Sequence, residues 1–238
     1  MRLPLNAIHW YIGWPFFLVV ALRSFAVRDT SGNSLNRLFG LSAITWLACF
    51  TVYALPPLLT TDSNVLTIST IVGDALQFIA LFILWVAVAR VYLPRLRWAR
   101  ILVVIADAMV VLVGIAITAQ VNLANPVTLT YVNGAWSINY VVSMGYQVVS
   151  AIQYASLLFL AARFWSQSLQ LTNRAQKIRL RAFAIGFLAI GGIYVSRPFF
   201  GSGTIDMSTS VLVAFSMIMT GLFIGATIYL SRRKTKLS

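Results

Sequence analysis

Asp74 is a carboxylate inside a long apolar stretch of the sequence, residues 66–90. An ionisable side chain within a membrane-spanning helix is costly, and it usually faces the interior of a helix bundle or a water-filled cavity. At helical spacing, three further polar side chains share a face with Asp74: Thr67, Thr70 and Gln77. The pattern predicts an inward-facing polar stripe, which is a suitable place for a ligand or a proton.

A second polar stripe lies in the stretch 138–163. Its members recur at helical spacing: Ser143, Gln147, Ser150 and Tyr154. We expect Gln147 and Tyr154 to line an outward-facing cavity together with Thr70, Asp74 and Gln77. Interhelical hydrogen bonds in membranes are worth only about 1 kcal/mol, so the alternative is a stripe that simply holds helices together.

Two further charged residues are candidates for the same cavity. Arg197, near the end of the stretch 181–200, either extends to the membrane interface or reaches inward towards Asp74. Asp107 lies in the stretch 100–120. It either titrates together with Asp74 as a charge relay or pairs with an arginine at the start of its own stretch.

Several kinds of chemistry are excluded by residue type. Lysines occur only outside the apolar stretches, which rules out a retinal Schiff base. One histidine, His9, and one cysteine, Cys49, do not suffice for a zinc or haem site. No hydrolase, metalloprotease or nucleotide-binding motif is present. We therefore expect neither an enzyme nor a bound metal or cofactor.

The composition places the chain in a membrane. Hydrophobic residues make up 60% of the 238 residues, charged residues only 10%, and the mean hydropathy is +0.86, whereas soluble domains carry about a quarter charged residues. Apolar runs recur along the whole length, so residues 1–238 are expected to form a single membrane domain. The net charge of +13 is interpreted as a topology signal, because the basic residues cluster between apolar runs, and nucleic acid is not an expected partner.

The expected fold is an all-α integral membrane protein, a bundle of seven transmembrane helices. The predicted spans are about 7–23, 37–58, 66–90, 100–120, 138–163, 181–200 and 208–231. Apart from Arg2 and Arg197, the lysines and arginines lie at the connections after spans one, three and five and in the C-terminal tail. The positive-inside rule then places the N-terminus outside and the C-terminus in the cytoplasm, with anionic lipid headgroups at the cytoplasmic face. We expect a multi-pass protein of the cell membrane, in particular a bacterial plasma membrane.

The connection between spans four and five predicts a short extracellular β-hairpin. Residues 127–138 alternate around Asn133-Gly134, and an Asn-Gly pair flanked by alternation is a strong hairpin signal. Such a hairpin acts either as a lid over a pocket or as a stiff connector. Two other polar residues have plainer interpretations, since His9 suits an interfacial aromatic belt and Tyr53 suits ordinary packing.

Three functions remain open. The first is a receptor- or sensor-like protein with a polar intramembrane cavity, acting through a protein partner in the membrane or at its basic cytoplasmic loops. The second is a small-solute or proton-coupled transporter or channel that uses Asp74 and Asp107. The third is an accessory or assembly subunit of a membrane complex. In topology alone, the outline is similar to seven-helix receptors and to the seven-span sensory regions of bacterial histidine kinases.

Overall fold

Six long helices form the body of the protein. The structure is a computed structural model, and it describes residues 2–26, 34–132, 134–200 and 211–221. The long helices are α1 (Ile8–Ala26), α2 (Ser34–Leu59), α3 (Ser63–Tyr92), α4 (Arg97–Ala124), α5 (Met144–Gln170) and α6 (Arg174–Phe200), and a 3-10 turn, η1 (Leu5–Ala7), precedes α1. Each of the six contains an apolar stretch long enough to cross a bilayer. The prediction of a multi-pass, all-α membrane protein is confirmed.

The seventh predicted span is described only in part. Residues Val211–Gly221 form an apolar helix, whereas the rest of the span, 208–210 and 222–231, lies outside the described residues. The predicted start of span five needs correction, because residue 138 belongs to a strand and α5 begins at Met144. Its start is fixed by Ser143, whose side chain accepts a hydrogen bond from the Tyr146 backbone N–H.

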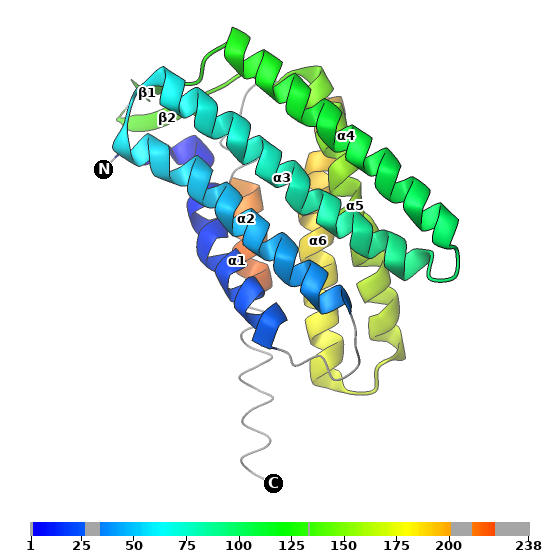
Figure 1. The fold of residues 1–238 in the computed structure, drawn as a ribbon. Coiled ribbons are helices and arrows are strands. Elements are labelled where there is room, and N and C mark those ends of the chain that lie inside the picture. Colours follow the sequence, from blue (N-terminus) through cyan, green and yellow to red (C-terminus); the bar gives the residue numbers. More distant parts are fainter. Residues whose placement is uncertain (1, 27–33, 133, 201–210, 222–238) are drawn as a thin grey trace, which may run out of the picture.

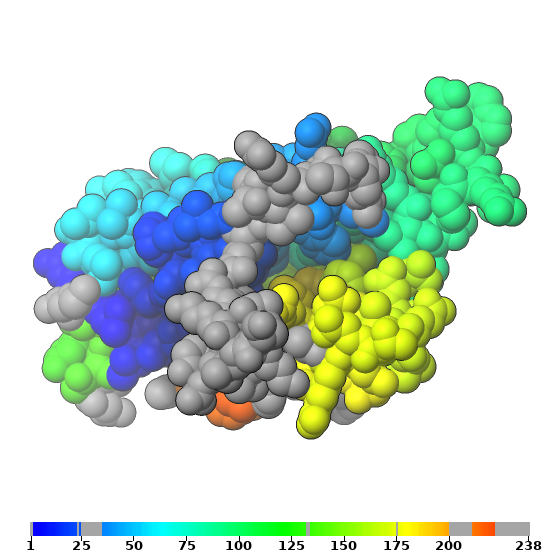
Figure 2. All heavy atoms as spheres, turned by 90° about the horizontal axis from the view of Figure 1, so that it is seen from below, coloured from blue at the N-terminus to red at the C-terminus, as the bar shows by residue number. Residues whose placement is uncertain are grey.

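Helix α3 is the centre of the bundle. It packs against α2, α4 and α5, while α1 packs on α2 and α6 on α5. The pairs α1–α2 and α5–α6 therefore lie on opposite sides of the bundle, with α3 in contact with both pairs (Figure 1). Seen from the end opposite the hairpin, the α3–α4 turn stands out from the rest of the molecule (Figure 2). That turn exposes Leu96 and Trp98 beside Arg95 and Arg97.

The predicted hairpin is present between α4 and α5. Strands β1 (Thr128–Val132) and β2 (Ala135–Asn139) are antiparallel, with Val132 paired to Ala135. Gly134 has φ +82°, a conformation that glycine adopts without a steric cost, and Asn133 lies outside the described residues. The hairpin covers the end of the bundle where the N-terminus lies (Figure 1).

Side-chain hydrogen bonds hold the hairpin against the helix bundle. The Asn6 amide donates to the Ile138 carbonyl (2.7 Å) and accepts from the Ile138 N–H (3.1 Å). On α3, the Ser63 hydroxyl donates to the Val127 carbonyl (2.8 Å), and the Val127 N–H donates to the Thr67 hydroxyl (2.9 Å). The hairpin is thus tied to the starts of both α1 and α3.

We predict that Asn6→Ala releases β2 from the N-terminal segment. The change removes both hydrogen bonds to Ile138 and should cost about 1–2 kcal/mol of local stability, at about 1 kcal/mol for each bond. Amide hydrogen exchange at Ile138 measures it, with an expected acceleration of about tenfold. Asn139→Ala is the matched control, since the exposed Asn139 side chain donates to the Thr130 hydroxyl across the hairpin (2.8 Å) and not to the N-terminal segment. Equal exchange rates at Ile138 in the two variants would show that the Asn6 hydrogen bonds do not hold β2 in place.

Candidate functional site

Asp74 is the centre of a buried hydrogen-bond cluster at the middle of the bundle. Its side chain is 2% exposed. The hydroxyls of Tyr53 on α2 and Tyr146 on α5 both donate to Asp74 Oδ1, the second over 3.0 Å. The Gln77 amide in turn donates to the Tyr146 oxygen (3.2 Å). One carboxyl group on α3 therefore connects two neighbouring helices, which satisfies a polar group that would otherwise be costly in an apolar interior.

Gly73 creates the space in which this cluster forms. A Cβ atom at Gly73 would lie 2.6 Å from Tyr53 Cε1, closer than van der Waals contact allows. The Cys49 thiol also donates to the Gly73 carbonyl over 3.3 Å. The missing side chain thus lets α2 approach α3 closely enough for the Tyr53 hydroxyl to reach Asp74.

The other predicted site residues are placed as follows. Thr70 is buried one turn from Asp74, and its hydroxyl donates to the Leu66 carbonyl (2.9 Å) of the same helix. Gln147 is buried on α5, next to Tyr146. Tyr154 lies two turns further along α5, where its ring stacks on Tyr194 of α6 with centroids 3.9 Å apart. Arg197 on α6 lies within electrostatic range of Asp74.

Tyr53 and Tyr146 are the two members of the Asp74 cluster that the sequence did not reveal. Tyr53 was expected to be packing material, and that interpretation is incomplete because its hydroxyl bonds to Asp74. A buried tyrosine normally finds a partner for its hydroxyl, so a tyrosine deep in a spanning helix was itself a signal. It did not identify the partner, which lies on another helix.

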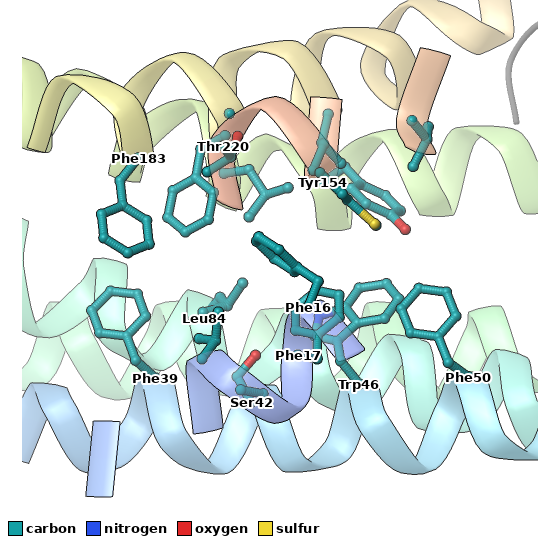
Figure 3. A pocket seen from close by; sticks show the side chains of 18 of the residues that line it. Phe16, Phe17, Phe39, Ser42, Trp46, Phe50, Leu84, Tyr154, Phe183 and Thr220 are labelled. Atoms are coloured by element: carbon teal, nitrogen blue, oxygen red, sulfur yellow. The ribbon is translucent and has the colours of Figure 1, made fainter. Parts of the chain in front are cut away.

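A large, mostly apolar cavity lies between α1–α2 and α5–α6. Its volume is about 310 Å³, at the lower end of the range for small-molecule pockets. Side chains from the two halves of the bundle face each other across it, as Figure 3 shows for Phe39, Ser42, Trp46 and Phe50 on one side and Tyr154, Phe183 and Thr220 on the other. Along α2 its lining extends from Asn36 to Tyr53, about 26 Å at 1.5 Å per residue. The space is elongated along the helices.

One end of the cavity lies beside the Asp74 cluster and is rich in polar side chains. Tyr53 and Gln77 belong to both the lining and the cluster, and His9 joins them from α1. His9 is buried against Trp10 and Phe50, with ring centroids 5.8 and 6.4 Å away, so it lies inside the bundle among aromatic side chains. Its Nδ1 atom is buried with no hydrogen-bond partner among the described residues. At the other end of the cavity, Phe39 and Phe183 are accompanied by two polar residues, Ser24 and Asn36, and the Ser24 hydroxyl donates to the Val20 carbonyl (2.9 Å).

Asp107 belongs to a separate cluster. Its Oδ1 accepts a hydrogen bond from the Gln153 amide on α5 (2.7 Å), so in the described part of the chain it pairs with a glutamine and not with an arginine. Thr118, which lines a small cavity with Asp74, is eleven residues from Asp107 on α4, about 16 Å along the helix. Asp74 and Asp107 are therefore not in contact, and a direct proton exchange between them is not favoured.

We predict that Gln153→Leu lowers the free energy of unfolding by about 1–3 kcal/mol, because it leaves a buried carboxyl group without its donor. Adding Asp107→Leu should recover most of the loss, since two apolar side chains need no hydrogen bond. Chemical unfolding in mixed micelles measures both effects. Gln170→Leu, at an exposed position near the end of α5, is the control. A double variant no more stable than Gln153→Leu would contradict the pairing.

The residues of these clusters do not form a metal centre of the usual kind. In residues 2–26, 34–132, 134–200 and 211–221, no three His, Cys, Asp or Glu side chains lie together as potential ligands. Comparisons with protein-family models, with curated proteins and with solved structures find no match to this chain.

Proposed function

We propose that the protein is a receptor-like membrane sensor that binds an elongated, mostly apolar molecule with one polar end. The observation that carries this proposal is the 310 Å³ cavity, which is lined mostly by apolar and aromatic side chains and has His9, Tyr53 and Gln77 at the end beside Asp74. A bilayer-dissolved, single-chain amphiphile has the matching shape and chemistry. Its chain would lie between Phe39 and Phe183, and its polar group would bond to His9 Nδ1 and the Gln77 amide.

The position of the cavity supports a sensing role. It separates α1–α2 from α5–α6, and the hydrogen bonds of Asp74 connect α2, α3 and α5 at its polar end. A ligand that contacts His9 and Gln77 would therefore favour one spacing of the two helix pairs over another. Binding shifts an equilibrium only through such a difference in affinity for two states.

The proposed orientation puts the hairpin outside and the opposite end in the cytoplasm, with a seventh span completed by residues 208–231. The α3–α4 and α5–α6 connections lie at that opposite end (Figure 1), and arginines cluster in and beside these connections in the sequence, which supports this topology. The protruding α3–α4 turn, with Trp98 80% exposed, suits contact with anionic headgroups or with an effector protein. We place the protein in a bacterial plasma membrane.

Fluorescence quenching in nanodiscs tests ligand binding. A dibrominated stearate quenches a tryptophan only at close range, and Trp46 lines the cavity at 7% exposure. The quenching assigned to Trp46, taken as the difference from Trp46→Phe, should saturate. Ala43→Phe, which fills the cavity wall, should weaken the saturable part at least tenfold. Leu102→Phe, at a 66% exposed position on α4, should leave it unchanged.

The proposed function fails if quenching of Trp46 rises only in proportion to the quencher, as it would from free lipid. It also fails if Ala43→Phe and Leu102→Phe behave alike. The wild-type protein could instead carry the same amphiphile across the membrane of sealed vesicles. If it does and the Ala43→Phe variant does not, the protein is a transporter and not a sensor.

A further inference from the structure

A second, much smaller cavity lies on the α4 side of Asp74. It is lined by α3, α4, the segment that joins β2 to α5 and the first turn of α5, and it shares no lining residue with the large cavity. Its volume is about 10 Å³, which is room for one water molecule or one small ion. The polar residues that line it are Asp74, Thr118, Asn122, Tyr140, Ser143 and Tyr146.

Two polar atoms of this lining are buried without a close partner. Thr118 Oγ1 and Asn122 Oδ1 have no hydrogen-bond partner within 3.5 Å among the described residues, although the side chains are only 2% and 3% exposed. The Thr118 hydroxyl lies beside the Asp74 carboxyl group. Thr118 and Asn122 are four residues apart on α4, so they lie on one face of the helix. Buried polar atoms in folded proteins are nearly always bonded. Two neighbouring exceptions that line one cavity therefore point to something bound in it.

The carboxyl group of Asp74 supplies the charge. Its Oδ1 already accepts two hydroxyl hydrogen bonds, from Tyr53 and Tyr146. Its Oδ2 is then the oxygen available to an occupant of the small cavity. A carboxylate, an amide oxygen and a hydroxyl are the oxygen ligands that hard cations prefer, and a single carboxylate matches a single positive charge.

We propose that this cavity binds one Na⁺ ion through Asp74 Oδ2, Thr118 Oγ1 and Asn122 Oδ1. The ion would neutralise the buried carboxylate and tie α4 to α3, beside the cluster that holds α2 and α5. Arg197 acts on Asp74 from α6, and α4 and α6 lie on opposite sides of α5 (Figure 1). The positive charge of Arg197 opposes cation binding, although Arg197 does not line the small cavity. The site does not depend on the ligand of the large cavity.

Thermal unfolding of the full chain in nanodiscs tests the site, with NaCl compared against choline chloride at equal ionic strength. A site filled tenfold above its dissociation constant should raise Tm by about 3–6 °C in a chain of this length. The nearly isosteric Thr118→Val/Asn122→Leu variant should lose the Na⁺-specific shift. Asp107→Asn, a change at a buried carboxyl group outside the cavity, should keep it. Arg197→Gln should lower the Na⁺ concentration for the half-maximal shift several-fold, because it removes an opposing charge.

Wild-type protein with the same Tm in NaCl and choline chloride would overturn the proposal and leave water as the occupant. This comparison uses only the wild-type protein, so it tests the Na⁺ site even where a substitution impairs folding. A Na⁺ shift that persists in Thr118→Val/Asn122→Leu, or that disappears in Asp107→Asn, would also overturn it. Bromostearate binding at the large cavity is measured separately, so failure of one proposal is distinguishable from failure of the other.

Discussion

Replacing Tyr53 and Tyr146 together by phenylalanine is expected to lower the free energy of unfolding by about 3 kcal/mol. Each substitution removes one hydroxyl that donates to Asp74 Oδ1, and each such bond is worth about 1.5 kcal/mol, the upper part of the range for interhelical bonds in membranes. The loss should be this large because the carboxyl group stays buried at 2% exposure. Water does not replace the lost donors there.

Equilibrium unfolding in mixed micelles measures this loss. The matched control is Tyr92→Phe, whose hydroxyl donates to the Phe159 carbonyl at an exposed position and should cost well under about 1 kcal/mol. Adding Asp74→Leu to the double variant should restore part of the stability, because an apolar side chain no longer needs donors. If the double variant is no less stable than Tyr92→Phe, Asp74 is not held by these hydroxyls.

Gly73→Ala is expected to cost about 2–4 kcal/mol, although alanine is the better helix former. The new Cβ would lie 2.6 Å from Tyr53 Cε1, so the ring must move and α2 must retreat from α3. The cost combines overpacking, about 1–3 kcal/mol, with the lost hydrogen bond from Tyr53 to Asp74. The change should therefore disturb the polar end of the large cavity as well as stability.

A double-mutant cycle measures the contact directly. In a Tyr53→Leu background the ring is gone, and Gly73→Ala should then cost less than about 1 kcal/mol. Gly192→Ala on α6 is the matched control, because a Cβ there has no atom within 4 Å, and it should be neutral. Equal costs for Gly73→Ala in the wild-type and Tyr53→Leu proteins would show that the ring is not what limits the approach of α2.

Local patterns in the sequence determined the elements of this fold. The apolar runs predicted six helices that the structure describes, and Asn133-Gly134 between alternating residues predicted the hairpin. The polar stripe also identified α3 as the helix with an inward face, where Thr70, Asp74 and Gln77 are buried. These features depend on residues within a few turns of one another, because helical and strand periodicity and turn conformation are set by near neighbours.

The partners of the polar residues were decided by the tertiary structure. Asp74 bonds to tyrosines 21 residues before it and 72 residues after it, while Asp107 bonds to Gln153. Periodicity shows that a side chain faces inward, but the neighbour that it meets depends on how closely the helices approach, here on the missing side chain of Gly73. The two cavities have the same origin, since each is the space left where side chains of several helices do not fill the interior.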